Sequence, residues 1–252
     1  TFPGFNRKQP NVVAVNDVSF EIPDGKLVGL LGPSGCGKST TLNLLSGLQK
    51  PTSGKIFFGE DDVTGIPPEN RGVGLVFQNY ALYPHLTVMQ NIIFPLQNLK
   101  GKDKLSKEQM KHKAIEVAKL VQIDSLMERK PSELSGGMRQ RVALIRTLAI
   151  SPDLLLLDEP FSALDFQTRL SVSADIGHII RSNQKTALLI THDLAEAISL
   201  SDRILVFGSR PANIKTNIPI KLTLKEDHPL AARNAPEFNE YLSRLWKELT
   251  HE

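Results

Sequence analysis

Residues 32–40 read GPSGCGKST, a glycine-rich segment that ends in a lysine and two hydroxyl side chains. Their spacing is that of a phosphate-binding loop, in which backbone N–H groups surround phosphate oxygens. In such a loop Lys38 neutralises the β- and γ-phosphates, and the Ser39 hydroxyl is placed to bind Mg²⁺. A plain glycine-rich turn is the alternative, but the apolar run before the segment and the helical pattern after it favour the phosphate loop. The residues expected to bind the nucleotide here are Ser34, Gly35, Cys36, Gly37, Lys38, Ser39 and Thr40.

Two adjacent carboxylates, Asp158 and Glu159, follow four leucines at residues 154–157. The leucines predict a buried strand, and the C-terminal end of such a strand is where an α/β sheet binds its ligand. We expect Asp158 to hold the metal ion, directly or through water, and Glu159 to polarise an attacking water. Taken alone, the pair fits an ordinary strand end equally well, but beside a phosphate loop it favours catalysis.

Two further polar side chains follow predicted core strands. His192 comes after the strand at 187–190, and Gln78 comes after the strand at 73–77. A single histidine is more often structural than catalytic, but this position makes His192 a candidate contact for the γ-phosphate. The Gln78 amide can touch both metal and water, and it can move with the segment that follows it.

A second glycine-rich turn, LSGGMRQR at residues 134–141, lies at the start of a helical pattern. Unpaired N–H groups and the helix dipole at such a start attract anions. Ser135, Gly136 and Gly137 therefore form a second candidate phosphate site. The residues alone do not say why one domain carries two.

The elements that would position these groups are short apolar runs separated by helical patterns. This alternation predicts an α/β fold with a mostly parallel sheet built from βαβ units. The runs lie at residues 27–31, 73–77, 154–157, 187–190 and 204–207. Segment 11–26 alternates instead like an antiparallel strand, and predicts a small β layer beside the nucleotide site.

Residues 80–146 have a helical pattern rich in lysine and glutamate. Ser106 and Gln109 form a capping-box pattern, and apolar positions follow at Ile115, Ala118 and Val121/Ile123. We interpret residues 1–252 as a single domain with an inserted helical subdomain. The expected parts are an α/β core with its antiparallel layer at 1–79 and 147–220, the helical subdomain at 80–146, and a C-terminal helical extension at 221–252.

The composition fits a globular protein with a sizeable core, at 252 residues, 40% hydrophobic and 23% charged. A net charge of +3 is too weak a bias to indicate nucleic acid as a partner. The only cysteine, Cys36, excludes an internal disulfide and favours a reducing compartment. No apolar run approaches the ~18 residues that would cross a membrane, so work at a membrane would require a partner.

Taken in their order along the sequence, the motifs resemble those of the ATPases of ATP-binding cassette (ABC) transporters, and the resemblance covers nearly the whole chain. GPSGCGKST is similar to the Walker A loop and LLLLDEP to the Walker B strand. LSGGMRQR resembles the family signature, although Met138 stands where glutamine is commonest. The resemblance implies catalytic roles for Glu159, the switch histidine His192 and the Q-loop residue Gln78, metal ligation by Ser39, Gln78 and Asp158, and a D-loop made of Ser162, Ala163, Leu164 and Asp165.

This resemblance accounts for the second phosphate site, because cassettes of this family pack head to tail in pairs. Ser135, Gly136, Gly137 and Met138 of one subunit then close over the γ-phosphate held by the Walker A loop of the other. The implied cofactors are ATP and Mg²⁺, and the implied partner is a second cassette, in a homodimer or a paired assembly. ATP would hold the pair together and hydrolysis would release it.

The family also stacks an aromatic residue on adenine, and Phe2 matches that position best, with Phe5 second. Since the chain begins at this point without a methionine, we expect the first β-strand of the family fold to precede residue 1.

The two halves of the chain resemble different importers. Residues 67–92 resemble carbohydrate importer ATPases, and their apolar residues 80–84 would receive a helix of the membrane partner or belong to the subdomain core. Later segments resemble nitrate, sulfonate and taurine importers, and the 45 residues after Phe207 are too few for the regulatory domain usual in carbohydrate types. This mixture also fits a recombination between two cassette lineages.

We therefore expect a small-anion importer cassette at the cytoplasmic face of the membrane. Its partners would be transmembrane permease subunits and a substrate-binding protein. A carbohydrate importer ATPase and a soluble non-transport ABC ATPase are the alternatives. A GTPase would need an Asn-Lys-x-Asp element, which the sequence lacks, and Glu159 argues against a nucleotide-binding regulator without hydrolysis.

Overall fold

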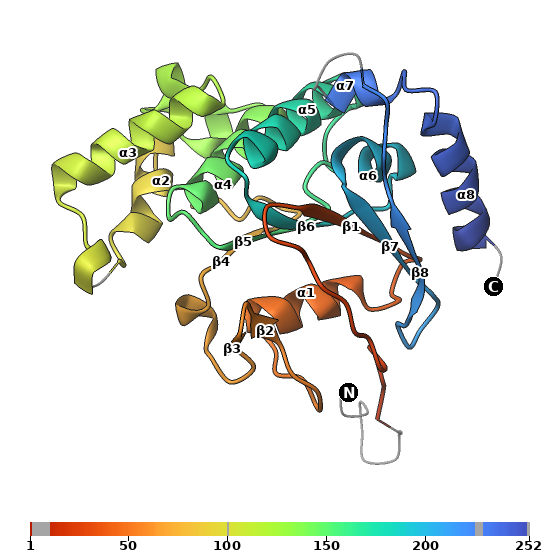
Figure 1. Ribbon diagram of the computed structural model, residues 1–252. Coiled ribbons are helices and arrows are strands. Elements are labelled where there is room, and N and C mark those ends of the chain that lie inside the picture. Colours follow the sequence, from red (N-terminus) through yellow and green to blue (C-terminus); the bar gives the residue numbers. More distant parts are fainter. Residues whose placement is uncertain (2–10, 100, 225–228, 251–252) are drawn as a thin grey trace.

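The computed structural model describes residues 1, 11–99, 101–224 and 229–250. Within these residues a six-stranded sheet forms the centre, in the order β4-β5-β6-β1-β7-β8 (Figure 1). Its strands pair in parallel except β8, which is antiparallel to β7. The strands are β4 (Val73–Val76), β5 (Leu154–Asp158), β6 (Thr186–Ile190), β1 (Leu27–Leu31), β7 (Arg203–Phe207) and β8 (Ile214–Pro219). The prediction of an α/β fold with a mostly parallel sheet is confirmed.

The leucine run of β5 is continuous because both faces of the sheet are covered. Leu155 and Leu157 belong to the larger core cluster on one face. Leu154 and Leu156 belong to a second cluster on the other face. Alternate side chains of the leucine run therefore fill two cores, and the polar residue of β5, Asp158, stands at its C-terminal end.

Helices cover the two faces unequally (Figure 1). Helix α1 (Lys38–Ser46) lies on one face, together with the small sheet of β2 and β3. The opposite face carries α4 (Gly136–Leu148), α5 (Phe166–Ser182) and α6 (Leu194–Leu200). At the β8 end, α7 (Pro229–Ala232) contacts α5 and α6, and α8 (Phe238–Thr250) contacts α6 and β7. The 3₁₀ helices are η1 (Pro68–Asn70), η2 (Gly101–Asp103), η3 (Asp124–Leu126) and η4 (Pro131–Glu133).

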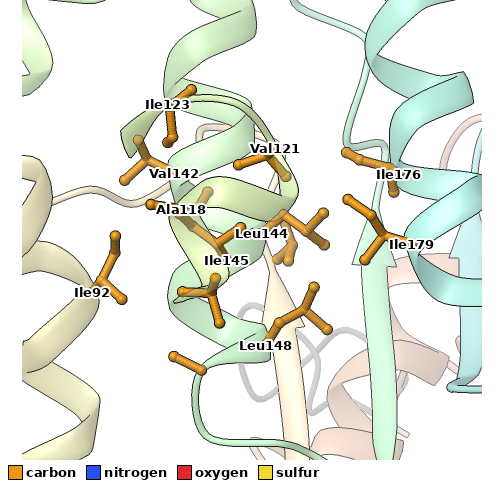
Figure 2. Close-up of a cluster of buried hydrophobic side chains, with 14 of the residues drawn as sticks. Ile92, Ala118, Val121, Ile123, Val142, Leu144, Ile145, Leu148, Ile176 and Ile179 are labelled. Atoms are coloured by element: carbon orange, nitrogen blue, oxygen red, sulfur yellow. The ribbon is translucent and has the colours of Figure 1, made fainter. Parts of the chain in front are cut away.

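The helical region adds α2 (Val88–Leu96) and α3 (Lys107–Leu120), which pack on α4. Figure 2 shows part of the shared core, where side chains from α3 and α4 lie opposite Ile176 and Ile179 of α5. The capping box of Ser106 and Gln109 forms at the start of α3, as predicted.

The predicted apolar face of α3 is partly wrong. Ile115 is 38% exposed, while Ala118 and Val121 are buried. The buried positions begin instead at Met110 and Ala114. These residues recur every three to four positions with Ala118, whereas Ile115 lies about 100° further around the helix.

The antiparallel layer is also in a different place from the one predicted. Segment 11–26 forms no regular strand among its described residues, and an isolated bridge joins Val15 to Ala212. The small antiparallel sheet consists of β2 (Phe57–Phe58) and β3 (Asp61–Asp62). Val15, Val18, Phe20 and Ile22 pack against the core beside α1, and the segment borders a cavity of about 1860 Å³ that separates it from β2. Its alternation therefore reflects burial and not strand pairing.

Candidate phosphate-binding site

The site lies at the C-terminal ends of β1, β5, β6 and β4. The phosphate loop, residues 32–37, joins β1 to α1, and Gly37 caps the helix without a side chain of its own. Gly37 has φ +125°, and a Cβ atom there would lie 2.7 Å from the Ala14 carbonyl oxygen. Only glycine fits this conformation in this space. The first N–H groups of α1 therefore have no side-chain cap and point to the loop.

Lys38 is held inside the phosphate loop. Its Nζ donates hydrogen bonds to the carbonyl oxygens of Gly32 at 2.7 Å and Pro33 at 3.0 Å. The side chain is 8% exposed. The carbonyl groups keep the ammonium at the centre of the loop, where it can neutralise an anion bound by the loop.

Asp158 ends β5 and lies close to the start of α1. Burial raises the pKa of its carboxyl, as does the charge of Glu159, whereas a hydrogen bond from Ser39 and the charge of Lys38 lower it. The Asp158 oxygens, the Ser39 hydroxyl and the Lys38 ammonium therefore belong to one electrostatic site, although β6 separates β5 from β1 in the sheet.

Glu159 follows directly and has a left-handed backbone with φ 45°. Its N–H donates to the Ile190 carbonyl oxygen at 2.9 Å, which extends the β5–β6 pairing past the end of β5. A positive φ is uncommon for a non-glycine residue and points to a local constraint. Here it turns the chain so that the carboxylate meets His192, whose Nδ1 lies 3.2 Å from Oε2 of Glu159.

Gln78 and the D-loop, residues 162–165, extend the site towards β4. Nε2 of Gln78 donates to the Ser162 hydroxyl oxygen at 3.2 Å, and that hydroxyl donates to the Glu159 carbonyl oxygen at 2.9 Å. Leu164 is buried, whereas Ala163 is exposed. At the end of the D-loop, the Asp165 carboxylate caps α5 by accepting from the Thr168 N–H at 3.1 Å.

The signature segment, residues 134–141, lies at the start of α4. The Ser135 hydroxyl caps this helix by accepting from the Met138 N–H at 3.3 Å. A Cβ atom on Gly137 would lie 2.6 Å from the Thr168 methyl group, so the two helix starts are in close contact. In the part of the chain that the structure describes, no hydrogen bond joins Ser135 or Met138 to the phosphate loop.

The structure thus brings Lys38, Ser39, Asp158, Glu159 and His192 together at one site, and Gln78 is joined to it through Ser162. Cys36, within the phosphate loop, is a buried free cysteine. Phe2 and Phe5, the candidates for adenine stacking, lie outside the described residues.

The sequence reasoning missed two residues near the site. Arg169 contacts both the D-loop and Asp193. Glu196, in α6, is 6% exposed, and one of its carboxylate oxygens has no hydrogen-bond partner among the described residues. An acidic residue three positions after Asp193 resembles a capping-box pattern and was the only local signal for Glu196.

A parallel sheet whose strand β1 runs into a glycine loop and a helix, with a carboxylate at the end of β5, defines a P-loop nucleotide-binding protein. A family model described as "ABC transporter" matches residues 15–162. The chain belongs to the ABC transporter family, and its fold is that of an ATP-binding cassette.

Relatives that are named for different substrates are similar to the chain to nearly the same degree. The sulfate/thiosulfate import ATP-binding protein CysA of Mesorhizobium japonicum is 47% identical over 195 residues, which cover 77% of this chain and 56% of that protein. The maltose/maltodextrin import ATP-binding protein MalK of Salmonella typhimurium is 46% identical over 199 residues, which cover 79% of this chain and 53% of that protein. The Fe(3+) ions import ATP-binding protein FbpC of Rhizobium etli is 46% identical over 206 residues, which cover 82% of this chain and 57% of that protein.

The chain therefore spans little more than half the length of these relatives. All three are ATP-binding proteins for import, which agrees with a cassette of importer type. None of the three is named for nitrate, sulfonate or taurine, so these comparisons do not support that narrower specificity.

A solved ATP-binding cassette, MJ0796, has the same fold. Its dimeric structure in a post-hydrolysis state bound to ADP and Pi superposes with a TM-score of 0.74 at 29% identity, covering 86% of this chain and 95% of that one. A second dimeric structure of MJ0796, described as a bacterial ABC transporter cassette, gives a TM-score of 0.74 at 30% identity, covering 85% and 94%.

Proposed function

We propose that the chain binds and hydrolyses Mg-ATP as one cassette of a head-to-tail pair in an ABC importer. The observation that carries this proposal is the convergence of Lys38, Asp158 and the Glu159–His192 contact at one edge of the parallel sheet. These residues form one half of the proposed composite site, here called the half-site. They offer a cation to neutralise phosphate, oxygen donors to bind a metal ion and a carboxylate to polarise water. The MJ0796 structure with ADP and Pi supports a nucleotide as the ligand.

The donor set at the end of β5 fits Mg²⁺. Ser39 offers a hydroxyl, Asp158 a carboxylate and Gln78 an amide oxygen, and Mg²⁺ prefers such hard oxygen ligands. Among the described residues, no group of three or more His, Cys, Asp or Glu side chains is arranged to hold a metal ion by itself. A small donor set suffices, because protein-bound Mg²⁺ keeps several waters and uses phosphate oxygens. When bound, the ion would stabilise charge on the transferred phosphate.

Glu159 is the proposed general base. Its carboxylate is 3.2 Å from His192 Nδ1, so a proton on that nitrogen would orient the carboxylate. The other ring nitrogen of His192 is then the proposed contact for the γ-phosphate. Gln78 would sense the same phosphate through water or metal, and it reaches Glu159 through the Ser162 hydroxyl.

The signature segment is proposed to complete the site of a second cassette. Ser135 is exposed, this segment packs on the start of α5, and no hydrogen bond joins it to the phosphate loop among the described residues. A helix start with an exposed serine and two glycines offers donors to an anion supplied by another chain. Neither half-site alone excludes water from the phosphate, so pairing would supply both donors and shielding.

The importer would work peripherally at the cytoplasmic face of the membrane, with permease subunits and a substrate-binding protein. The described residues contain no helix long and apolar enough to span a membrane. Tyr80 is buried in the helical core, but Tyr83 and Phe94 are more than a third exposed, with ring centroids 4.6 Å apart. This aromatic pair is the proposed contact for a permease helix.

A small anion is the proposed substrate class. The sulfate/thiosulfate relative supports it, whereas the maltose relative, at nearly the same identity, favours a carbohydrate as the second candidate. Growth of a transport mutant complemented with this chain would separate these classes. Sulfate or taurine would be the only sulfur source, nitrate the only nitrogen source, or maltose the only carbon source.

Lys38→Ala and Glu159→Gln test the chemistry directly. Lys38→Ala should lose nucleotide binding, because the phosphate charge is no longer neutralised in the loop. Glu159→Gln should bind ATP normally but hydrolyse it at least about a hundredfold more slowly, as expected for the loss of a general base. Fluorescent-nucleotide titration and phosphate release measure the two effects. Normal affinity in Lys38→Ala would refute the phosphate assignment.

A further inference from the structure

Arg169, in the second turn of α5, joins two loops that are far apart in the sequence. Its Nη2 donates to the Leu164 carbonyl oxygen of the D-loop at 2.9 Å. Its Nη1 lies 3.6 Å from Oδ2 of Asp193. The Arg169 and Asp193 side chains are 25% and 27% exposed, so the bridge is largely covered by protein.

Asp193 in turn fixes the backbone next to His192. Its Oδ1 accepts from the Glu196 N–H at 3.0 Å and so caps α6. Its own N–H donates to the Thr191 hydroxyl at 3.0 Å. Asp193 is therefore held by its carboxylate to α6 and Arg169 and by its N–H to Thr191, on the other side of His192, so a shift of Asp193 would move the ring that contacts Glu159.

The same stretch of α5 touches the signature segment. Leu164 and Thr168 lie against the positions where Gly136 and Gly137 would carry Cβ atoms, at 3.2 Å and 2.6 Å. The beginning of α5 thus contacts the signature glycines, the D-loop and, through Arg169, the loop of His192. A displacement of the signature segment would be passed to Leu164, whose carbonyl group is the partner of Arg169.

We propose that Arg169 is a positioning residue that couples the D-loop to His192 and so sets the His192–Glu159 contact. The inference rests on the proposed ATPase function. A guanidinium can hold two partners at once because its donors point in fixed, separate directions. A lysine keeps the charge but has one ammonium and cannot reproduce both contacts with the same geometry.

The test compares Arg169→Met, Arg169→Lys and Asp193→Asn with the wild type in steady-state ATP hydrolysis. Asparagine caps helices about as well as aspartate, so Asp193→Asn removes the charge while keeping the α6 cap. We expect kcat to fall about tenfold in each variant while KM for Mg-ATP changes less than about twofold, since alignment and not ground-state binding is lost. Combining Arg169→Met with Asp193→Asn should cause no loss beyond the larger single effect.

Arg181→Met is the matched control. Arg181 lies near the other end of α5 and donates to the Leu200 carbonyl oxygen at 3.5 Å, away from the site. This variant should keep the wild-type kcat. Thermal unfolding of all variants separates misfolding from misalignment, because a merely structural role would lower stability without splitting kcat from KM.

Three outcomes would overturn the inference: an unchanged kcat in Arg169→Met, a KM effect without a kcat effect, or independent losses in the double variant. The ATPase proposal is tested beside it by Lys38→Ala. Wild-type turnover that disappears in Lys38→Ala together with a normal kcat in Arg169→Met would refute the role of Arg169 alone. An inactive wild type would refute the ATPase proposal itself.

Discussion

Glu196 is a buried carboxyl group that the proposed catalysis does not use. Burial, followed by the neighbouring charge of Asp193, raises its pKa from 4.5 to about 8, against a hydrogen bond with Thr191 and the charge of Arg169. The folded chain therefore keeps a proton at neutral pH that the unfolded chain releases. The contribution of protonated Glu196 to the free energy of unfolding is therefore complete below pH 4.5 and is lost as the pH rises through about 8.

Glu196→Gln should remove this pH dependence, because glutamine resembles the protonated carboxyl group and cannot ionise. Between pH 5 and pH 8 the wild type should lose up to about 1.4 kcal/mol of unfolding free energy per pH unit relative to the variant. Urea unfolding at several pH values measures the difference. Parallel stability curves for the two proteins would contradict a buried, protonated Glu196.

At the scale of elements, α1 is fixed at its far end by a buried arginine. Arg71 is 4% exposed, and its guanidinium donates to the carbonyl oxygens of Leu44 at 2.7 Å and Leu45 at 2.9 Å, at the C-terminal end of α1. Its other donors reach the Ile66 and Thr64 carbonyl oxygens at 2.8 Å and 3.0 Å. A cation at this end also complements the helix dipole. The helix that carries Lys38 at its start is thereby joined to the segment leading into β4.

Arg71→Lys should destabilise the fold by about 3 kcal/mol, since one ammonium cannot satisfy carbonyl groups in separate directions and some would stay unpaired. Arg203→Lys is the control, because among the described residues the ion pair of Arg203 is a loose contact of 3.9 Å with the exposed Glu21. This control should change stability by less than about 0.5 kcal/mol. Chemical unfolding measures both, and equal effects would contradict the account of Arg71.

Elements with a strong local pattern were predictable from the sequence. The leucines of β5 and the glycines before Lys38 each identify their structure within a few residues. Segment 11–26 was misassigned because pairing depends on a partner strand elsewhere in the chain, while alternation depends only on burial. Arg71, Arg169 and Glu196 were missed for a related reason: each acts through partners that only the folded chain brings near.

At the scale of the whole molecule, the phosphate loop and the signature segment are two separate proposed anion sites. The phosphate loop lies at the C-terminal end of β1, and the signature segment packs on the start of α5. If both sites serve one nucleotide, two chains must meet in opposite orientations, as an isologous pair allows. The dimeric structures of the MJ0796 cassette are consistent with such pairing.

Light scattering of Glu159→Gln tests the pairing. This variant should be monomeric alone and dimeric with Mg-ATP, because ATP binds but turns over slowly. Adding Ser135→Arg should keep the monomer, since a bulky cation would occupy the position proposed for the γ-phosphate contact. Ser106→Arg is a matched control, because Ser106 is also an exposed N-cap but precedes a different helix, α3. ATP-dependent dimers of the Ser135→Arg variant would contradict the composite site.

The strand order has a mechanical consequence for Gln78. The strands that end at the phosphate loop, Asp158 and the His192 loop have neighbours on both sides. In the part of the sheet that the structure describes, β4 lies at one edge and has β5 as its single neighbour. Amides of β1, β5 and β6 should therefore exchange with solvent only through global opening, while those of β4 can exchange through a smaller, local one. Gln78, which contacts Ser162, thus lies just beyond the least restrained strand of the site. The end of β4 can move while the other strands of the site keep their register.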